Sequence, residues 1–320
     1  MEILRVDPVV HWVSWDLINS AGVSTPMFSI DEHPMWVYAV DGRYIEPMEV
    51  NAISITNGAR YSVLVKLDKP PGDYTIRFPN NGLNQIINAT AILSYDIPHK
   101  AQTRPSQPYI DIVGSNTTAD TIILDETKVV PFPVVTPSNE IDRTYKLFVD
   151  HQNHSYRWIL GNNSFDMSYE NSTPLLFNRT SIPTDLTIST RNGTWVDIII
   201  EARNPVQPPH PIHKHSNKYF VIGQGTGAFN YSTVAEAMED IPEFFNLQTP
   251  QIRDTFITPP VQAEPTWLAL RYQVVNPGPF LLHCHLQVHL SGGMAIALLD
   301  GVDKWPTVPE GYELPAVEDD

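Results

Sequence analysis

The chain of 320 residues contains a single cysteine, Cys284. A lone cysteine cannot form an internal disulfide, so a small disulfide-stapled scaffold is excluded. Basic side chains are also scarce, because 20 Lys and Arg stand against 36 Asp and Glu, for a formal net charge of −16. This balance argues against nucleic acid as a partner. No apolar run approaches the ~20 residues that a membrane-spanning helix needs, so we expect no membrane association.

A recognisable secretory signal is missing too, since charged and polar residues interrupt every apolar stretch near Met1. Eight Asn-x-Ser/Thr sequons nevertheless favour a secretory, extracellular glycoprotein, and they begin at Asn88, Asn116, Asn153, Asn162, Asn171, Asn178, Asn192 and Asn230. Secreted character without a leader predicts that the start of the protein is missing from this sequence.

Short β-branched runs and 29 prolines indicate an all-β fold. Turn signals such as Asp41-Gly42 and Asn57-Gly58 separate the predicted strands at the spacing of a β-sandwich or barrel. One helix is expected at 233–245, where Thr233 and Glu236 are placed for a capping box.

The strand pattern predicts two β-domains in tandem. We expect an unplaced segment at 1–16, a first domain at 17–100, a proline-rich linker at 101–125 and a second domain at 126–320.

The stretch His283 to Met294, HCHLQVHLSGGM, carries the most chemistry. In a strand, successive side chains point to opposite faces, so His283 and His285 would face one way and Cys284 the other. A thiolate, imidazoles and a weak axial thioether are the ligands of a blue-copper site. Cys284, His289 and Met294 supply three such ligands, and the Ser-Gly-Gly turn would bring Met294 back toward Cys284.

A second cluster, HPIHKH at 210–215, supplies the missing imidazole. Pro211 shifts the pattern so that His210 can face the cysteine, while His213 and His215 would join His283 and His285. Surface or core histidines are the ordinary alternative, but six histidines at these spacings make it a poor one. Zinc is a stronger competitor, although structural zinc sites more often use paired cysteines, and a thioether favours copper.

These motifs resemble the multicopper oxidase family. The matching stretches are FSIDEH (28–33), NGARYSVLV (57–65), HPIHKHSNKYFVIG (210–223), IRDTFITPP (252–260) and RYQVVNPGPFLLHCHLQVHLSGGM (271–294). From about residue 17 onward the chain is similar to the second and third cupredoxin domains of laccases and ascorbate oxidases, with Greek-key β-sandwich folds. The HKHSNK variant is closest in pattern to fungal laccases associated with pigment formation.

The resemblance implies roles for individual residues. His210, Cys284 and His289 would bind a type 1 copper, with Met294 as the axial partner. His213 would bind a type 2 copper, and His215, His283 and His285 would bind a type 3 pair.

Electrons from a reducing substrate would enter through His289 and Cys284, the two residues expected to be catalytic. They would then reach a trinuclear cluster, where O2 is reduced to water. Phenols, including pigment precursors, are the expected donors, whereas ascorbate and Fe(II) remain alternatives.

The sequence departs from the family in one respect. The family cluster uses eight histidines, four of them from a first cupredoxin domain with paired His-x-His motifs. His11, His33, His99, His151 and His154 form no such pair. We therefore expect the first domain to be absent, the type 1 site to be complete and the type 2 and type 3 ligands to be partial. Such a chain alone would bind at most one copper firmly and would not turn over O2.

Two other functions stay open. A non-catalytic blue-copper-binding glycoprotein would share the cysteine site without oxidase chemistry, and a zinc-stabilised adhesion-like protein is a more distant alternative. Asp254 resembles a position that supports the copper ligands in the family, although an Arg253–Asp254 surface pair would explain it equally well. Glu236, Glu239 and Asp240 are candidates for orienting a substrate by loop position only.

Overall fold

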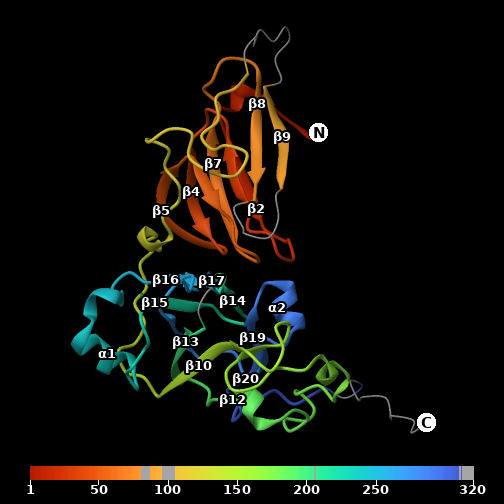
Figure 1. The fold of residues 1–320 in the computed structure, drawn as a ribbon, viewed down its shortest axis with the longest axis vertical. Coiled ribbons are helices and arrows are strands. Elements are labelled where there is room, and N and C mark those ends of the chain that lie inside the picture. Colours follow the sequence, from red (N-terminus) through yellow and green to blue (C-terminus); the bar gives the residue numbers. More distant parts are fainter. Residues whose placement is uncertain (81–86, 96–104, 205–206, 310, 312–320) are drawn as a thin grey trace.

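The computed structural model describes residues 1–80, 87–95, 105–204, 207–309 and 311. They form two β-rich units stacked along the long axis of the molecule, with β1 to β9 in one and β10 to β20 in the other (Figure 1). Among these residues, every helix is too short or too polar to cross a bilayer.

The strands of the first unit are β1 (Ile3–Val6), β2 (Trp12–Ile18), β3 (Met27–Ile30), β4 (Met35–Val40), β5 (Arg43–Val50), β6 (Ala52–Ser54), β7 (Arg60–Lys66), β8 (Asp73–Pro79) and β9 (Asn88–Tyr95). Those of the second unit are β10 (Arg143–His151), β11 (Trp158–Leu160), β12 (Thr187–Ser189), β13 (Trp195–Ala202), β14 (Pro211–Lys214), β15 (Tyr219–Thr226), β16 (Gln251–Arg253), β17 (Thr255–Ile257), β18 (Thr266–Gln273), β19 (Gly278–Cys284) and β20 (Ala295–Asp300). The α-helices are α1 (Val234–Asp240) and α2 (Gln287–Ser291), and the 3₁₀ turns are η1 (Pro8–Val10), η2 (Glu126–Lys128), η3 (Met167–Asn171), η4 (Thr184–Leu186) and η5 (Pro242–Phe244).

The first unit is a sandwich of a five-stranded sheet, β1-β9-β8-β3-β6, and a four-stranded sheet, β2-β7-β4-β5. Strand β7 shows why these residues pair as they do. Tyr61, Val63 and Val65 are buried, whereas the residues between them are partly exposed, which is the alternation of a strand with one face on a core. These side chains pack in the core with Phe28 and Ile30 of the opposite sheet.

The segment 1–16, which the sequence left unplaced, contributes two edge strands of this unit. Strand β1 pairs in parallel with β9, and β2 pairs antiparallel with β7. Trp15 packs against the core and contacts the ring of Phe28.

The second unit is a larger sandwich of a six-stranded sheet, β11-β10-β13-β18-β15-β16, and a five-stranded sheet, β12-β20-β19-β14-β17. Strands β13 and β18 are buried along nearly their whole length because both of their faces are covered. One face meets the opposite sheet, and the other meets Val234 and Ala237 of α1. The predicted helix is therefore present but shorter, with Thr233 as its N-cap, as expected.

The stretch after residue 104 lies against the first unit and is not a free tether. Ser106 donates a hydrogen bond to Asp31, and Leu124 and Val129 belong to the core of that unit. Residues 101–104 of the predicted linker lie outside the described part. The architecture is nearly all-β, as the sequence predicts.

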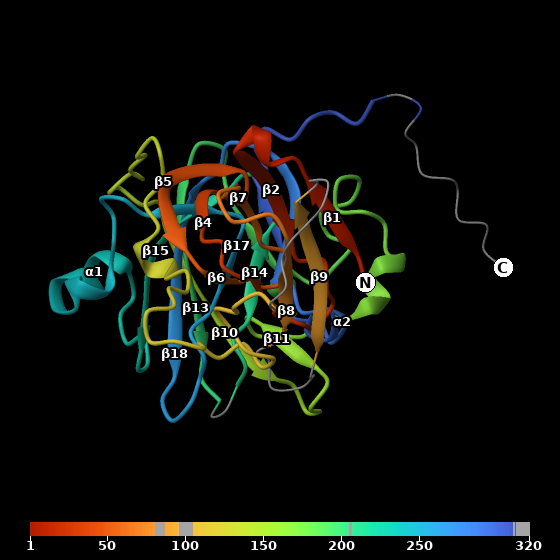
Figure 2. The same cartoon turned by 90° about the horizontal axis from the view of Figure 1, so that it is seen from above.

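Charged side chains join the two units where they meet. The guanidinium of Arg253 is fully buried and donates to Asp41 (2.7 Å) and Glu126 (2.9 Å). A view from above shows the strands of the first unit overlying β14 and β17 of the second (Figure 2). The junction between the units therefore lies directly over the sheet that carries both histidine clusters.

Candidate metal centre

Strands β14 and β19 bring the two sequence clusters together. They pair antiparallel, with Ile212 opposite Cys284 and His213 opposite His283. After β19 the chain turns through α2 and returns as β20, which also pairs with β19. Gly293 makes this return possible, because its φ is +96° and a Cβ there would meet the backbone of Phe165 at 2.9 Å.

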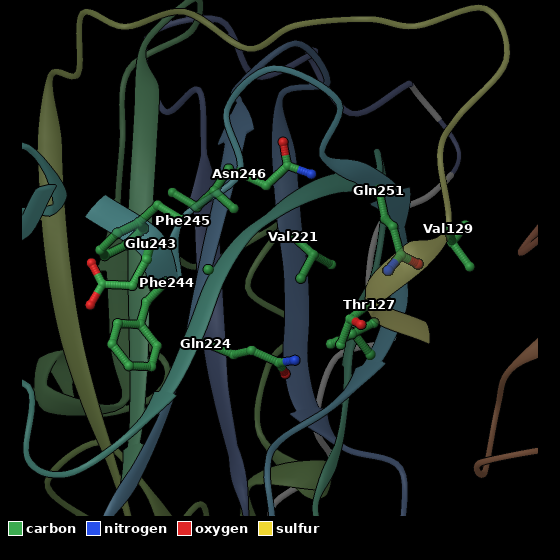
Figure 3. A pocket seen from close by; sticks show the side chains of 12 residues that line it. Thr127, Val129, Val221, Gln224, Glu243, Phe244, Phe245, Asn246 and Gln251 are labelled. Atoms are coloured by element: carbon green, nitrogen blue, oxygen red, sulfur yellow. The ribbon is translucent and has the colours of Figure 1, made fainter. Parts of the chain in front are cut away.

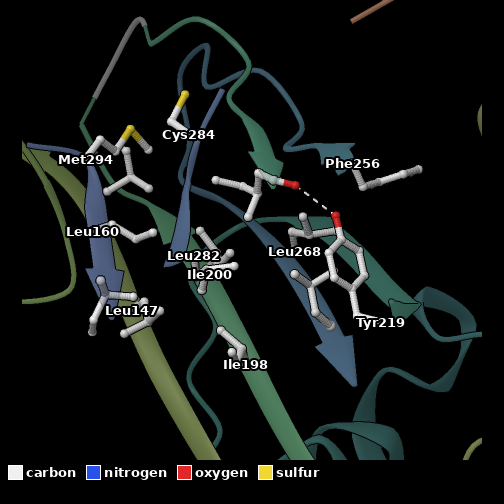
Figure 4. Packing of buried hydrophobic residues seen from close by; sticks show 14 of the residues in the cluster. Leu147, Leu160, Ile198, Ile200, Tyr219, Phe256, Leu268, Leu282, Cys284 and Met294 are labelled. Carbon is white, nitrogen blue, oxygen red and sulfur yellow. Dashed lines mark hydrogen bonds between the residues drawn. The ribbon is translucent and has the colours of Figure 1, made fainter. Parts of the chain in front are cut away.

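One group lies on the sulfur side of β19. The Sγ of Cys284 is 3.5 Å from Nδ1 of His289 and 3.8 Å from Nδ1 of His210, and these two nitrogens are 3.1 Å apart. All three side chains are buried. The amide of Cys284 donates to the carbonyl of Met294 (3.1 Å), and both sulfur-bearing side chains lie in one buried cluster (Figure 4).

The electrostatics of this group suit a soft cation. Burial raises the pKa of the Cys284 thiol to about 12 and lowers the pKa of His289 to about 4. Burial also holds the pKa of His210 well below its usual value. Without a cation the imidazoles are therefore neutral, ready to bind through a lone pair, and a metal would displace the thiol proton. The donor set of one thiolate and two imidazoles fits copper.

Two residues that the sequence did not suggest hold this group in place. The Nε2 of His210 lies 3.2 Å from Oε1 of Gln207, which leaves Nδ1 facing the sulfur. The indole of Trp158, in β11, lies 4.1 Å from the ring of His289 between ring centroids and 3.8 Å from that of His151. Trp158 therefore contacts both the buried His289 and the exposed His151.

A second group lies on the other side of the strand. The ligand nitrogens of His213, His215 and His283 all lie within 4.8 Å of one another. The Nε2 atoms of His215 and His283 are 3.2 Å apart. The ring of His285 is more distant, with its centroid 5.6 Å from that of His213 and 5.7 Å from that of His283. This group is more open, because His215 is exposed whereas His283 is buried.

Backbone carbonyls fix the orientation of this second group. The Nδ1 of His283 lies 2.8 Å from the carbonyl of Cys284, and the Nδ1 of His213 lies 2.8 Å from the carbonyl of Asp254. Each contact places the N–H on Nδ1 and leaves Nε2 for a metal. Burial lowers the pKa of both imidazoles to about 4.

Asp254 is part of an ionic network and not of the simple surface pair that was its alternative. Its carboxylate accepts two hydrogen bonds from Arg60 of the first unit and is also paired with Lys218. Burial alone would raise the pKa of Asp254, but the hydrogen bonds from Arg60 and Lys218 outweigh it and hold the pKa below its usual value. Arg253 points elsewhere, to Asp41 and Glu126.

Lys214, the last residue of β14, stands between His213 and His215 in the chain and points to the opposite face. Its ammonium is buried, donates to the carbonyls of His215 and Asn217, and lies 3.8 Å from the Asp300 carboxylate. Burial lowers its pKa to about 8, although Asp300 opposes this.

The acidic residues suggested for orienting a substrate lie elsewhere. Helix α1, with Glu236, Glu239 and Asp240, is on the opposite side of the second unit from α2, which carries His289 (Figure 1). Glu236 instead accepts a hydrogen bond from the amide of Ser232, within the helix cap.

Within the described part of the chain, the other histidines named from the sequence do not join either group. His33 is buried in the first unit beside Tyr95, and His99 lies outside the described residues. A cavity of about 280 Å³, lined among others by Thr127, Gln224 and Phe245, contains none of the histidines and no part of Cys284 (Figure 3). The chemistry-bearing residues are therefore concentrated on β14, β19 and α2.

Comparisons with known proteins agree with this arrangement. Two family models described as multicopper oxidase match residues 11–98 and 161–304. The chain is 47% identical over 313 residues to a laccase, abr2, of Aspergillus fumigatus, covering 96% of this chain and 53% of that protein. It is 41% identical to Laccase-1 of Emericella nidulans, covering 95% of this chain and 54% of the relative. The chain thus spans about half the length of these relatives.

Solved structures show the same fold. The laccase from Botrytis aclada superposes with a TM-score of 0.75 at 26% identity, covering 96% of this chain and 54% of that one. Fet3p, a multicopper oxidase that functions in iron import, superposes with a TM-score of 0.70 at 21% identity, over 93% of this chain and 57% of that one. The expectation of a cupredoxin-like all-β fold is therefore confirmed.

Proposed function

This chain belongs to the multicopper oxidase family, and from that premise we propose that it carries the electron-accepting half of a laccase-like oxidase. The observation that supports this most directly is the placement of one thiol and two imidazoles on one side of β19 and a histidine group on the other. We propose phenols as donors, by likeness to the fungal laccases.

We assign His210, Cys284 and His289 to a type 1 copper, with Met294 as its axial partner. His213 is assigned to a type 2 copper, and His215, His283 and His285 to a type 3 pair. When bound at these positions, copper would supply one-electron oxidation of the donor and reduction of O2 to water.

The chain's own residues shape both groups. Burial of Cys284 and His210 excludes water from the first group, and Gln207 orients the ring of His210. Trp158 covers the ring of His289, which is the ligand candidate nearest the surface of that group. The peptide bond between His283 and Cys284 gives the two groups a direct covalent connection.

The histidine group is open on one side, because His215 is exposed. Among the residues that the structure describes, four imidazoles come together there, counting the more distant His285, and eight are expected for a family cluster. We propose that this chain alone holds one copper firmly at Cys284, binds further copper weakly, and sustains no oxygen reduction. The same open histidine group favours the second candidate function, a blue-copper-binding glycoprotein without oxidase activity.

The test is to measure copper stoichiometry, the blue absorption band and oxygen uptake with a phenol on the purified chain. One firmly bound copper with a blue band and no sustained uptake is expected. Four coppers with sustained uptake would refute the limitation to one firm site, and absence of any blue band would refute the assignment of Cys284.

Secretion is proposed on separate grounds. The asparagines of all eight sequons are exposed, so each is sterically open to glycosylation. Expression in a eukaryotic secretory host, followed by glycosidase digestion and mass measurement, tests this. No mass change on digestion would contradict it.

A further inference from the structure

Arg60 lies at the start of β7 in the first unit, yet its guanidinium reaches Asp254 of the second unit, beside the histidine group. We propose that Arg60 is a positioning residue that orients two imidazoles of that group, His213 and His285, from across the junction between the units. The inference rests on the proposed function, since it takes this group to be a metal site.

The first connection runs through Asp254. Arg60 donates from Nη1 to Oδ1 (2.5 Å) and from Nη2 to Oδ2 (2.8 Å) of Asp254, which is a bidentate pair with fixed geometry. The backbone carbonyl of the same aspartate lies 2.8 Å from Nδ1 of His213. Thr255 completes the link, because its hydroxyl lies 3.0 Å from that Nδ1 and 3.3 Å from Oδ1 of Asp254. Fixing Asp254 therefore fixes the ring and the tautomer of His213.

The second connection runs through Gly58. Nη1 of Arg60 also donates to the carbonyl of Gly58 (3.1 Å). Gly58 has a φ of +81°, and a Cβ at this position would lie 2.8 Å from Nε2 of His285. The imidazole of His285 therefore rests directly on the turn that Arg60 holds. The Arg60 guanidinium thus supports the two backbone segments that contact the imidazoles of His213 and His285.

A role in stability alone would not require this arrangement. The Arg60 guanidinium also lies 3.3 Å from the buried Asp41 carboxylate, so its removal should cost stability as well, and the copper titration is what separates the two roles. Partners that orient a metal ligand change metal affinity strongly when they are removed. Arg77 is a matched control. It forms a bidentate pair with Asp31 (2.7 and 2.8 Å), lies in the same unit as Arg60, and contacts neither the Cys284 group nor the histidine group.

The experiment compares the full chain with its R60M, R60K and R77M variants. Each is titrated with Cu(II), while the blue absorption reports on the Cys284 site and electron paramagnetic resonance reports on non-blue copper. In R60M we expect non-blue copper to bind about tenfold more weakly or worse, with an unchanged blue band. R60K should be intermediate, because an ammonium keeps the charge but not the planar fork. R77M should match the wild type in both signals.

Two results with the variants would overturn the inference. One is non-blue copper affinity in R60M equal to that of the wild type within the error of the titration. The other is an equal loss of both copper signals in R60M and R77M, which would indicate a general loss of structure. If the wild type shows the blue band but takes up no non-blue copper, the positioning role falls while the Cys284 assignment stands. If it shows neither signal, the proposed function itself fails.

Discussion

Cys284 and His283 are neighbours in the chain, yet their side chains belong to different groups. Sγ of Cys284 lies 3.5 Å from Nδ1 of His289, whereas Nε2 of His283 lies 3.2 Å from Nε2 of His215. The alternation of a β-strand produces this separation without any special backbone feature. Neighbouring residues of one strand therefore belong to two chemically distinct groups of ligand candidates.

Replacing Cys284 with alanine should abolish the blue absorption that copper gives with the intact chain. The substitution removes the thiolate but leaves His215 and His283 on the other side of the strand, so non-blue copper binding should persist. Loss of one buried sulfur should cost about 1 kcal/mol of unfolding free energy. Absorption and paramagnetic resonance spectra after Cu(II) addition measure both effects. A blue band in the variant would show that the thiolate is not the ligand.

Replacing Trp158 should loosen the first group because its indole packs on His289. We expect W158A to lower the unfolding free energy by about 3–5 kcal/mol and W158F by less. Both variants should lose copper from the Cys284 site to a chelator faster than the wild type. Trp195 of β13, which packs against Phe220 of β15 in the same sheet, supplies a control variant, W195F. Unchanged chelation kinetics in W158A would mean that Trp158 does not protect the site.

Much of the site could be predicted because its residues fall into two short clusters, 210–215 and 283–294. The pattern HCHLQVHLSGGM fixes which side chains share a face, and the spacing in HPIHKH separates His210 from His213. The strands followed from the same reasoning, as β7 shows with its alternation. The helix cap at Thr233 was visible because a cap is a local motif.

The supporting residues could not be predicted because they are distant in sequence. Arg60 and Asp254 are 194 residues apart, and only packing of the two units brings them together. Trp158 and Gln207 carry no local signal for a metal site, since each is also an ordinary strand or loop residue. The burial of both faces of β13 and β18 could not be predicted for a similar reason, because an apolar run does not show which elements cover it.

The pH dependence of stability should include a contribution from His33. Burial lowers its pKa in the folded chain from the usual 6.5, although the Asp31 carbonyl opposes this. Because the pKa of His33 is lowered in the folded state, unfolding takes up a proton below pH 6.5. Above that pH the imidazole is neutral in both states, so the folded chain keeps its full stability. Stability should therefore fall by up to about 1.4 kcal/mol per pH unit as the pH drops from 6.5 toward the folded pKa.

The H33Q variant removes this contribution. Its unfolding free energy, measured in urea between about pH 5 and pH 7.5, should have a shallower acid slope than the wild type. The exposed His154 gives the control H154Q, which should retain the wild-type slope. Equal slopes in all three proteins would show that His33 is protonated equally in the folded and unfolded states.

Gly58 and Gly42 allow the strain of a left-handed residue to be separated from the contact with His285. Both have positive φ, +81° and +73°, so alanine at either position should cost about 1 kcal/mol. A Cβ at Gly42 would meet nothing within 4 Å, whereas at Gly58 it would lie 2.5 Å from Cδ2 of His285. G58A should therefore cost a further ~1–3 kcal/mol, because the imidazole must move or the turn must shift.

The same displacement should alter the paramagnetic resonance spectrum of non-blue copper in G58A, while G42A keeps the wild-type spectrum. Urea unfolding and copper titration of the two variants, side by side, make the comparison. If G58A and G42A lose equal stability and share one spectrum, the ring of His285 moves aside freely. In that case the first unit does not set the position of the His285 ring. A ring held in place by Gly58 could not accommodate the added methyl group without a change in the copper spectrum.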